Sequence, residues 1–324
     1  MLFAADLATK LPDTAVLMYY VQNPALPDGS GAFVSTDEPG EYVAGMSADP
    51  DRTDEQTLEV IRTLVGIPDL DVQVLGSSTW EIAHRVADRM SAGRVHLIGD
   101  AVHLMPPTGG QGGNIAMLDG LHLAWKLAAV VKREAGPGLL ASHSDEQLPY
   151  GEAVADWQYA NMIERLRPDF VDDSLPAPVG STALMFGYRP STGAFVAEGE
   201  PGELFEDPTA PSGRPGTRAP HVPLLRDGIP LSTRDLLFRG FVLLTGDPAW
   251  VARADKAAAD LGIRLDSYLI GADLADPEGG WTRSYGVASD GAVLIRPDGL
   301  IGWRSRAGSS GDTLDSALRA ILDR

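Results

Sequence analysis

One segment of the sequence, residues 94–127, combines residue types suited to binding a polar, electron-rich ring. An apolar stretch at 94–98 runs directly into Gly99 and Asp100, and a loop of prolines and glycines follows, ending at Asn114. Glycines let backbone amides approach a ligand closely, and a carboxylate after a strand can accept hydrogen bonds from sugar-type hydroxyls. The helix expected after Asn114 begins with unpaired N–H groups and a partial positive charge. The segment therefore predicts a site for a polyol-linked ring that accumulates negative charge.

These residues resemble the second flavin-binding motif of the FAD-dependent aromatic hydroxylases, and in particular of the polyketide hydroxylases. The resemblance implies that Asp100 binds the ribityl hydroxyls of FAD, while the loop lies beside the isoalloxazine. It also implies that the dipole of the following helix stabilises the anionic reduced flavin. The cofactor-binding residues expected on this basis are Gly99, Asp100, Pro106, Gly109, Gly110, Gly112, Gly113 and Asn114.

The resemblance further implies an FAD-dependent monooxygenase that uses NAD(P)H, with NADPH bound only transiently. The expected reaction is hydroxylation of an electron-rich ring, such as a polyketide or phenol. Because the cofactor carries this chemistry, no catalytic side chain is predicted. Tyr19 and Trp80 are candidates for a substrate pocket, although aromatic residues on strands more often belong to a core.

The dinucleotide-binding fingerprint of the family, Gly-x-Gly-x-x-Gly between a strand and a helix, is absent from this sequence. Gly29 and Gly31 are followed by Val34 where the third glycine should stand, and Gly136 and Gly138 follow a helix. Activity would therefore need the missing segment, either from a complementing N-terminal chain or from upstream coding sequence, or a homodimer that completes the site. The alternative is a non-redox remnant, acting as a binding or assembly protein or as a cofactor-free catalyst in polyketide biosynthesis.

Two histidines near the motif have other interpretations. His103 has the residue type of a proton carrier, but a structural histidine is the better prediction because no base partner is identifiable. His122, at a position where the family usually has asparagine, is interpreted as a packing or surface residue. No spacing of ligating side chains predicts a metal, and no Gly-x-Ser-x-Gly elbow predicts a hydrolase.

Periodicity predicts the elements that position the motif. Strands are expected at 16–21, 32–34, 41–46, 71–75, 78–82 and 94–98, with the last of the buried type. Helices are expected from Thr53 to Pro68, over 115–132 and over 147–167. The helix at 115–132 is expected to carry an apolar stripe made of Met117, Leu118, Leu121, Ala124, Trp125, Leu127 and Ala128. Farther on, strands at 239–245 and 263–270 flank a helix at 249–261. The stretches 284–287, 292–299 and 301–304 are expected to form a late hairpin, with the Pro-Asp-Gly of 297–299 as its turn, before a helix at 314–322.

This pattern predicts a mixed α/β chain with a truncated aromatic-hydroxylase fold followed by a thioredoxin-like domain. The expected parts are a partial substrate-binding β-sheet domain (1–91), a flavin-binding segment with helices (92–186), and a linker arm with the thioredoxin-like domain (187–324). The sequence contains no cysteine, so this last domain cannot perform dithiol chemistry.

The net charge of the chain limits the kinds of partner that it can bind. With 26 Lys and Arg against 45 Asp and Glu, the net charge is −19, which opposes binding to nucleic acid or to anionic membranes. No run of eighteen apolar residues predicts a membrane span, and the first residues lack the features of a secretory signal. A cytoplasmic protein with a small aromatic substrate is expected.

Overall fold

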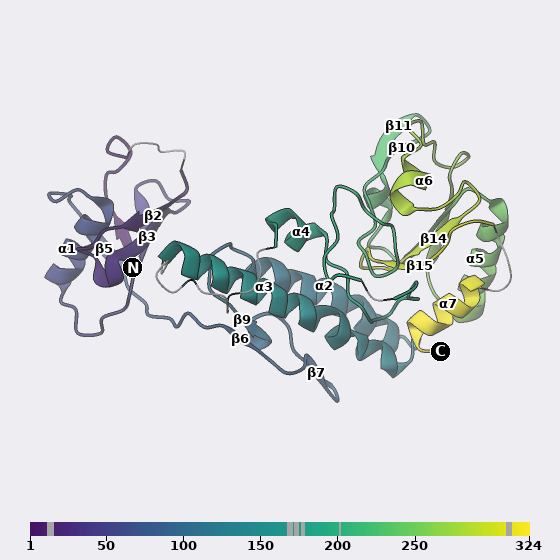
Figure 1. Cartoon of the computed structure of the whole chain (residues 1–324), viewed down its shortest axis with the longest axis horizontal. Helices are drawn as coiled ribbons and strands as arrows, with labels where there is room; N and C mark the ends of the chain where they lie inside the picture. The colour runs from purple at the N-terminus through teal and green to yellow at the C-terminus, as the bar shows by residue number, and fades with distance from the viewer. Residues whose placement is uncertain (12–15, 167–170, 172–174, 176–178, 201, 309–312) are drawn as a thin grey trace. The chain divides into compact units, whose positions relative to one another are not determined.

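The computed structural model describes residues 1–11, 16–166, 171, 175, 179–200, 202–308 and 313–324. By its internal contacts the chain separates into two compact units, which are described one at a time (Figure 1). The first unit comprises Met1–Ile82 with Ile163–Val171, and the second comprises Ala83–Met162 with Asp172–Arg324. The three-part division expected from the sequence stays a prediction.

The first unit is a five-stranded antiparallel sheet with one covering helix. Its strands are β1 (Leu2–Ala4), β2 (Met18–Gln22), β3 (Ser30–Ser35), β4 (Glu41–Gly45) and β5 (Gln73–Gly76), in the order β2-β3-β4-β1-β5. A 3-10 turn, η1 (Pro27–Gly29), joins β2 to β3. The helix α1 (Asp54–Val65) begins with a capping box on Thr53 and ends at Gly66 in the left-handed conformation, before Pro68. Its buried Ile61 and Leu64 pack with Phe3 and Phe33 of the sheet.

The strand expected at 78–82 is wrong. The chain has no regular structure from Ser77 to His84, and Trp80 and Ile82 have 63% and 46% of their surface exposed. No neighbouring strand among the described residues pairs with this stretch, so its β-favouring composition is not realised.

The second unit begins with four two-residue strands. The strands β6 (Arg85–Val86) and β9 (His103–Leu104) pair with each other, as do β7 (Ser91–Ala92) and β8 (Val95–His96). The prediction of a buried strand at 94–98 is therefore wrong, because Val95 is 61% exposed and Ile98 is 43% exposed. In the described part of the chain, the only strand paired with β8 is the equally short β7, so no sheet covers these apolar side chains.

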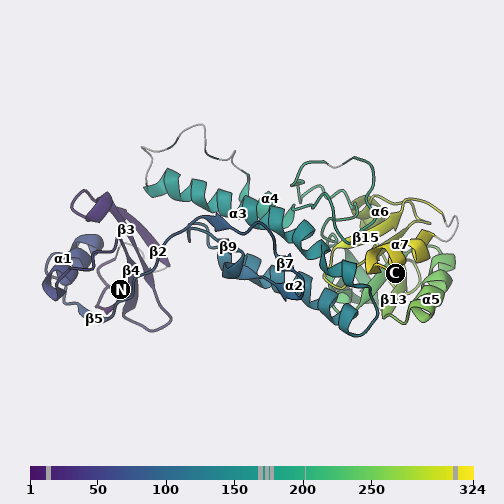
Figure 2. The ribbon, with the colours of Figure 1, turned by 90° about the horizontal axis from the view of Figure 1, so that it is seen from below.

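Two long helices form the middle of the second unit. The helix α2 (Gly112–Val131) runs beside α3 (Ser142–Leu166), as both Figure 1 and Figure 2 show, and η3 (Pro137–Leu140) connects them. A short helix, α4 (Ser181–Phe186), follows. Among the described helices, only α2 is long and apolar enough to cross a membrane by length and composition.

The helix α2 buries polar side chains and exposes part of its expected apolar stripe. Its buried face carries Asp119, His122 and Lys126 together with apolar residues. On the other side, Met117 is 68% exposed, Leu121 is 38% exposed and Val131 is 80% exposed. The apolar stripe expected from the sequence is therefore divided: Leu118 and Trp125 pack against buried clusters, whereas Met117, Leu121 and Ala128 are exposed. We call Met117, Leu121 and Val131 the exposed apolar face of α2.

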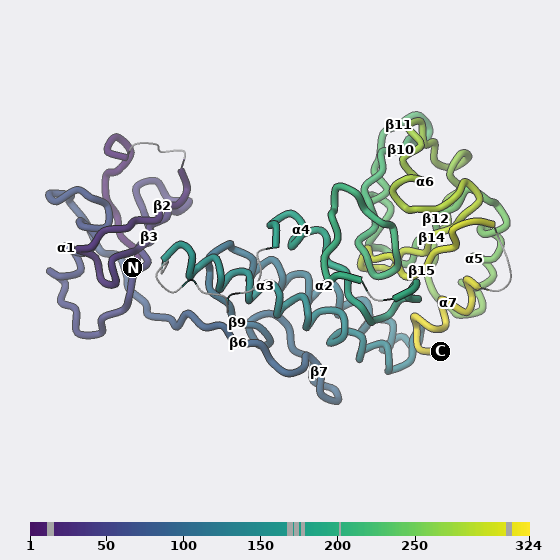
Figure 3. Tube along the Cα trace, in the orientation of Figure 1, coloured from purple at the N-terminus to yellow at the C-terminus, as the bar shows by residue number. Residues whose placement is uncertain are grey.

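The chain from Gly187 to His221 contains no helix or extended strand among its described residues, as the trace in Figure 3 shows. Hydrogen bonds nevertheless hold this stretch against the rest of the second unit. The backbone N–H of Ala194 donates to Glu146 Oε1 at 2.6 Å, and the N–H of Val196 donates to the Gly302 carbonyl at 2.8 Å. The expected linker arm thus packs along both the helices and the C-terminal sheet.

The last part of the second unit is a four-stranded mixed sheet preceded by a hairpin. The hairpin joins β10 (Pro223–Arg226) to β11 (Ile229–Ser232), and η5 (Thr233–Leu236) follows. The sheet has the order β13-β12-β14-β15, from β12 (Phe241–Thr245), β13 (Leu265–Leu269), β14 (Ala292–Ile295) and β15 (Ile301–Ser305). Only β12 and β13 are parallel, and α5 (Pro248–Leu261) connects them. This βαβ unit followed by a β-hairpin and a helix is the thioredoxin-like arrangement that the sequence predicts.

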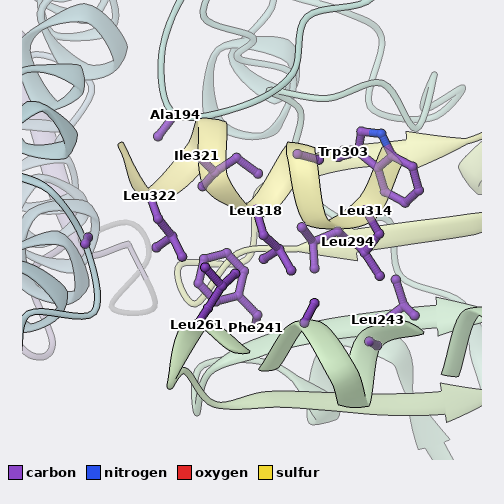
Figure 4. Close-up of a cluster of buried hydrophobic side chains, with 14 of the residues drawn as sticks. Ala194, Phe241, Leu243, Leu261, Leu294, Trp303, Leu314, Leu318, Ile321 and Leu322 are labelled. Atoms are coloured by element: carbon purple, nitrogen blue, oxygen red, sulfur yellow. The ribbon is translucent and has the colours of Figure 1, made fainter. Parts of the chain in front are cut away.

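Both faces of this sheet are covered, which explains why β12 and β14 consist entirely of buried residues. On one face α5 and α7 (Thr313–Leu322) pack against Phe241, Leu243 and Leu294 (Figure 4). On the other face lies α6 (Gly280–Tyr285), whose Trp281 and Tyr285 are buried. The strand expected at 284–287 is wrong, because its first two residues end this helix.

A buried group of charged side chains joins α2 and α3 to the C-terminal sheet. Glu146 on α3 accepts two hydrogen bonds from Arg296 and one from Lys126 of α2, at 2.7, 2.7 and 2.8 Å. Asp298 also accepts from Arg296, and it receives the Trp125 indole N–H at 2.8 Å. His122 Nδ1 lies 2.9 Å from the same carboxylate. We call Lys126, Glu146, Arg296 and Asp298, two cations and two anions, the charge network.

The electrostatics of the charge network depend on pairing, because all four side chains are fully buried. Burial alone would raise the pKa of Glu146, but Arg296 and Lys126 outweigh it and lower that pKa to about 2. Burial would likewise raise the pKa of Asp298, and Arg296 and His122 hold it well below its ordinary value. Burying such a pair of charges costs desolvation free energy. Removing one partner therefore leaves the other charge buried and uncompensated.

We expect Glu146→Gln to destabilise the protein by about 3–5 kcal/mol at neutral pH, because it leaves Arg296 and Lys126 buried without their shared anion. Since the folded pKa of Glu146 lies below its ordinary value of 4.5, its contribution is complete above pH 4.5 and is lost as the pH falls toward about 2. Urea unfolding at several pH values measures both effects. The exposed pair Lys256–Asp260 is the control, and Asp260→Asn should change the midpoint little. Equal midpoints for Glu146→Gln and the parent protein would contradict this account.

Candidate functional site

The turn that begins the predicted site is built around Gly99. Gly99 is buried with φ of 58°, and a Cβ at this position would lie 3.1 Å from the Cβ of Ala116 on α2. Both the left-handed backbone and the close approach to α2 therefore require glycine. Asp100 follows in η2 (Gly99–Ala101) with an exposed side chain, and it makes no side-chain hydrogen bond among the described residues. Its carboxylate is thus available to a ligand.

Asp119, on the buried face of α2, holds this turn in place. Its Oδ2 atom accepts the Gly99 backbone N–H at 2.9 Å and lies 2.8 Å from His103 Nε2. Both Asp119 and His103 are almost completely buried. One carboxylate therefore fixes the position of the Gly99–Asp100 turn relative to the helix.

The glycine loop itself is shaped by tight contacts on one side and open space on the other. Gly109 has φ of 117°, and a Cβ there would lie 2.4 Å from Trp157 on α3. Gly110 and Gly113, in contrast, have no atom within 4 Å of the place where a Cβ would stand. Pro106 is buried in the same loop. The loop thus packs against α3 while it presents bare backbone on its other side.

The helix α2 begins without a side-chain cap. Its N-cap residue, Gln111, makes no capping hydrogen bond, and the first turn contains no acidic residue. Gly112, Gly113 and Asn114 form that turn, and the Asn114 side-chain amide donates back to the Gly110 carbonyl at 3.1 Å. Uncapped amides and the positive end of the helix dipole favour an anion or an electron-rich ring here.

The structure brings together all eight predicted cofactor-facing residues in one segment of the second unit, from Gly99 to Asn114. A role for each in cofactor binding stays a prediction. The two aromatic pocket candidates belong to the first unit, where Tyr19 stacks on Phe33 at 4.7 Å between ring centroids and Trp80 is exposed. Their role in a substrate pocket also stays a prediction. Among the described residues, no group of three or more His, Cys, Asp or Glu side chains could hold a metal ion.

Sequence reasoning missed the partners of both histidines. His103 pairs with Asp119 and His122 pairs with Asp298, and in each case the carboxylate is far along the chain. The spacing of Asp119, His122 and Lys126 at three- and four-residue intervals places them on one helix face, which was the available signal. The position of His122 in the core corrects its interpretation as a surface residue, whereas its alternative as a packing residue agrees with the structure.

We expect Gly109→Ala to destabilise the protein by more than about 1 kcal/mol, because the methyl group would meet Trp157 and strain the positive φ. Gly113→Ala is the matched control in the same loop. It has open space and lies in the first turn of a helix, so it should be neutral or stabilise by up to roughly 1 kcal/mol. Urea midpoints of the two variants make the comparison. A Gly109→Ala protein as stable as the parent would show that the loop does not depend on the contact with Trp157.

Comparison with known proteins identifies the family. Residues 1–158 match a family described as FAD binding domain, and residues 212–324 match one described as aromatic-ring hydroxylase, C-terminal. The chain is 37% identical over its whole length to aklavinone 12-hydroxylase of Streptomyces purpurascens, covering 62% of that protein. It is 36% identical over 99% of its length to 4-methyl-5-nitrocatechol 5-monooxygenase of a Burkholderia species, again covering 62%. The chain thus spans about three-fifths of the length of these curated relatives.

Solved structures agree with the sequence comparison. The fold resembles aklavinone-11 hydroxylase in its complex with FAD and aklavinone, with a TM-score of 0.94 and 37% identity, covering 100% of this chain and 62% of that one. It also resembles the flavin-dependent monooxygenase PieE in complex with FAD and substrate, with a TM-score of 0.84 and 30% identity, covering 99% of this chain and 64% of that one. The glycine loop, the thioredoxin-like C-terminal sheet and these matches together place the chain in the family of FAD-dependent aromatic hydroxylases.

Proposed function

We propose that this chain forms the ribityl and isoalloxazine side of the FAD site of an aromatic-ring monooxygenase. The observation that carries the proposal is the free carboxylate of Asp100 beside an uncapped helix start and a bare glycine loop. Such a site offers an acceptor for hydroxyls and donors for an electron-rich ring. The relatives named above, two of them in complexes with FAD and substrate, support the same assignment.

The residues present fit this cofactor. Asp100 would accept hydrogen bonds from the ribityl hydroxyls, and the open faces of Gly110 and Gly113 leave room for a flat ring to approach the backbone. The N-terminus of α2 would stabilise negative charge on that ring. When bound, FAD would take electrons from NADPH and supply the oxygen chemistry that hydroxylates a polyketide or phenolic ring. The chain itself positions the cofactor, and no side chain of its own is assigned a catalytic role.

We further propose that a dinucleotide-binding segment that this sequence does not contain, encoded upstream of it or carried by a second polypeptide, completes the site. The sequence lacks the Gly-x-Gly-x-x-Gly fingerprint, so a groove for the ADP half of FAD has to come from elsewhere. The exposed apolar face of α2, together with the exposed Val95 of β8 and the exposed Ile98 just after it, provides an uncovered apolar surface for it. We also propose that the protein is cytoplasmic.

Absorbance spectroscopy tests the cofactor assignment. The chain is co-expressed with the part of the Streptomyces purpurascens relative that lies outside the matched region, incubated with FAD and filtered. We expect retained flavin in the parent complex and about tenfold weaker retention in Asp100→Ala, since a hydrogen-bonded charged acceptor is lost. The exposed Asp255 on α5 is the control, and Asp255→Ala should retain FAD as the parent does.

One outcome would count against an FAD-dependent enzyme, and another would count against the role of Asp100. A folded complex that retains no flavin would favour the alternative, a binding or assembly protein without redox chemistry or a cofactor-free catalyst. Equal retention by Asp100→Ala and Asp255→Ala would remove Asp100 from the site.

The completing segment can be tested separately through the exposed apolar face of α2. We expect Met117→Lys with Val131→Lys to abolish co-purification of that segment, because charges on a buried apolar interface are costly. Both side chains are exposed in this structure, so the unfolding midpoint of the isolated chain should change little. The matched control places lysine at Ile229, which is 69% exposed on the hairpin. Undiminished co-purification of the double variant would place the segment elsewhere.

A further inference from the structure

A cavity of about 140 Å³ lies in the second unit between the middle of α2 and the C-terminal sheet domain. Its lining includes Leu118, His122, Arg218, Arg234, Leu237 and Phe238. None of its lining residues belongs to the segment from Gly99 to Asn114 that carries the proposed flavin site. The cavity is therefore a separate feature of the unit, with its own chemistry.

The cavity is bordered by two arginines that lack an acidic partner. Neither Arg218 nor Arg234 makes a side-chain hydrogen bond or ion pair in the part of the chain that the structure describes, although Arg218 lies 5.5 Å from the ring centroid of Phe186. Burial and the neighbouring charge of Arg234 lower the pKa of Arg218. Asp298 also lines the cavity, but Arg296, His122 and Trp125 already occupy its carboxylate. Two neighbouring cations at a partly buried cavity favour the binding of an anion.

An aromatic residue in a strained conformation stands at the same cavity. Phe238 has φ of 71° and is 49% exposed, although a bulky aromatic side chain rarely adopts the left-handed region and an apolar ring is usually buried. Its ring packs near Gly299, whose Cβ, if present, would lie 3.2 Å from it. Strained residues of this kind gather at ligand-binding sites. The ring of Phe238, together with Leu118 and Leu237, gives the cavity apolar lining in addition to its two arginines.

We propose that this cavity binds a monocyclic aromatic carboxylate. The volume suits a single ring, since an apolar protein cavity of about 150 Å³ accommodates benzene. The guanidinium groups of Arg218 and Arg234 would donate charge-assisted hydrogen bonds to the carboxylate, and the ring would pack on Phe238. A phosphate ion would satisfy the charges and leave the apolar wall uncovered, so the combination of the two chemistries favours an aromatic acid.

Titration of 4-fluorobenzoate into the purified full chain, followed by ¹⁹F NMR, tests the proposal without flavin or NADPH. We expect saturable binding to the parent protein and about tenfold or greater weakening in Arg218→Met and in Arg234→Met. Arg239→Met, which removes an exposed charge next to Phe238, should bind as the parent does. Phe238→Gly should weaken binding without lowering the unfolding midpoint, because glycine relieves the positive φ.

The neutral probe 4-fluorobenzyl alcohol separates charge from ring recognition and should not saturate. The proposal is overturned by the absence of saturable 4-fluorobenzoate binding, by equal binding of the neutral probe, or by unchanged binding in both arginine variants. Since the assay contains no cofactor, none of these results bears on FAD retention, and failure of the flavin proposal leaves this one intact.

Discussion

The second unit depends on the pairing of Arg296 with two carboxylates in a place that water does not reach. Arg296 directly follows β14 of the C-terminal sheet, and its partners are Glu146 on α3 and Asp298 two residues farther on. Because Lys126 of α2 shares Glu146, both long helices and the sheet meet at one set of hydrogen bonds. Each charge is tolerable only while the others are present, so the pieces have to assemble together. The position of the glycine loop depends on this arrangement, because the loop leads directly into α2.

The distribution of polar and apolar residues on α2 links the structure to the proposed function. A helix that buries Asp119, His122 and Lys126 while it exposes Met117 and Val131 reverses the usual pattern of a surface helix. The buried acid Asp119 fixes the Gly99 turn, and the buried base Lys126 anchors α2 to α3. The outward face has no such task within the described residues, and it has the composition of an interface. The two faces thus have separate purposes, one internal and one for a further segment.

The sequence predicted most of what local rules control. The start of α1 at Thr53, the apolar runs of β12 and β14 and the Pro-Asp-Gly turn between β14 and β15 all follow from residue type and spacing. The predictions failed where tertiary partners decide the outcome. Strands expected at 78–82 and 94–98 are missing or very short because the described chain supplies no extended neighbour, and Ser284 and Tyr285 are helical because α6 covers the sheet. The charge network could not be foreseen, since its hydrogen-bonded pairs are up to 150 residues apart. The candidate loop was recognised as a contiguous motif, whereas its support by Asp119 and Trp157 required the structure.

The bidentate contact between Glu146 and Arg296 also has a consequence for recombination among relatives. A chimera that exchanged the C-terminal domain at the arm after α4 would take Arg296 and Asp298 from one parent and Lys126 and Glu146 from the other. If the incoming domain lacked either member of its pair, unmatched charge would be sealed inside the hybrid. A crossover at this point is therefore expected to preserve stability best between parents that share the same four residues. The backbone of the domain could be exchanged between relatives, whereas its buried charges tie it to the matching charges on α2 and α3.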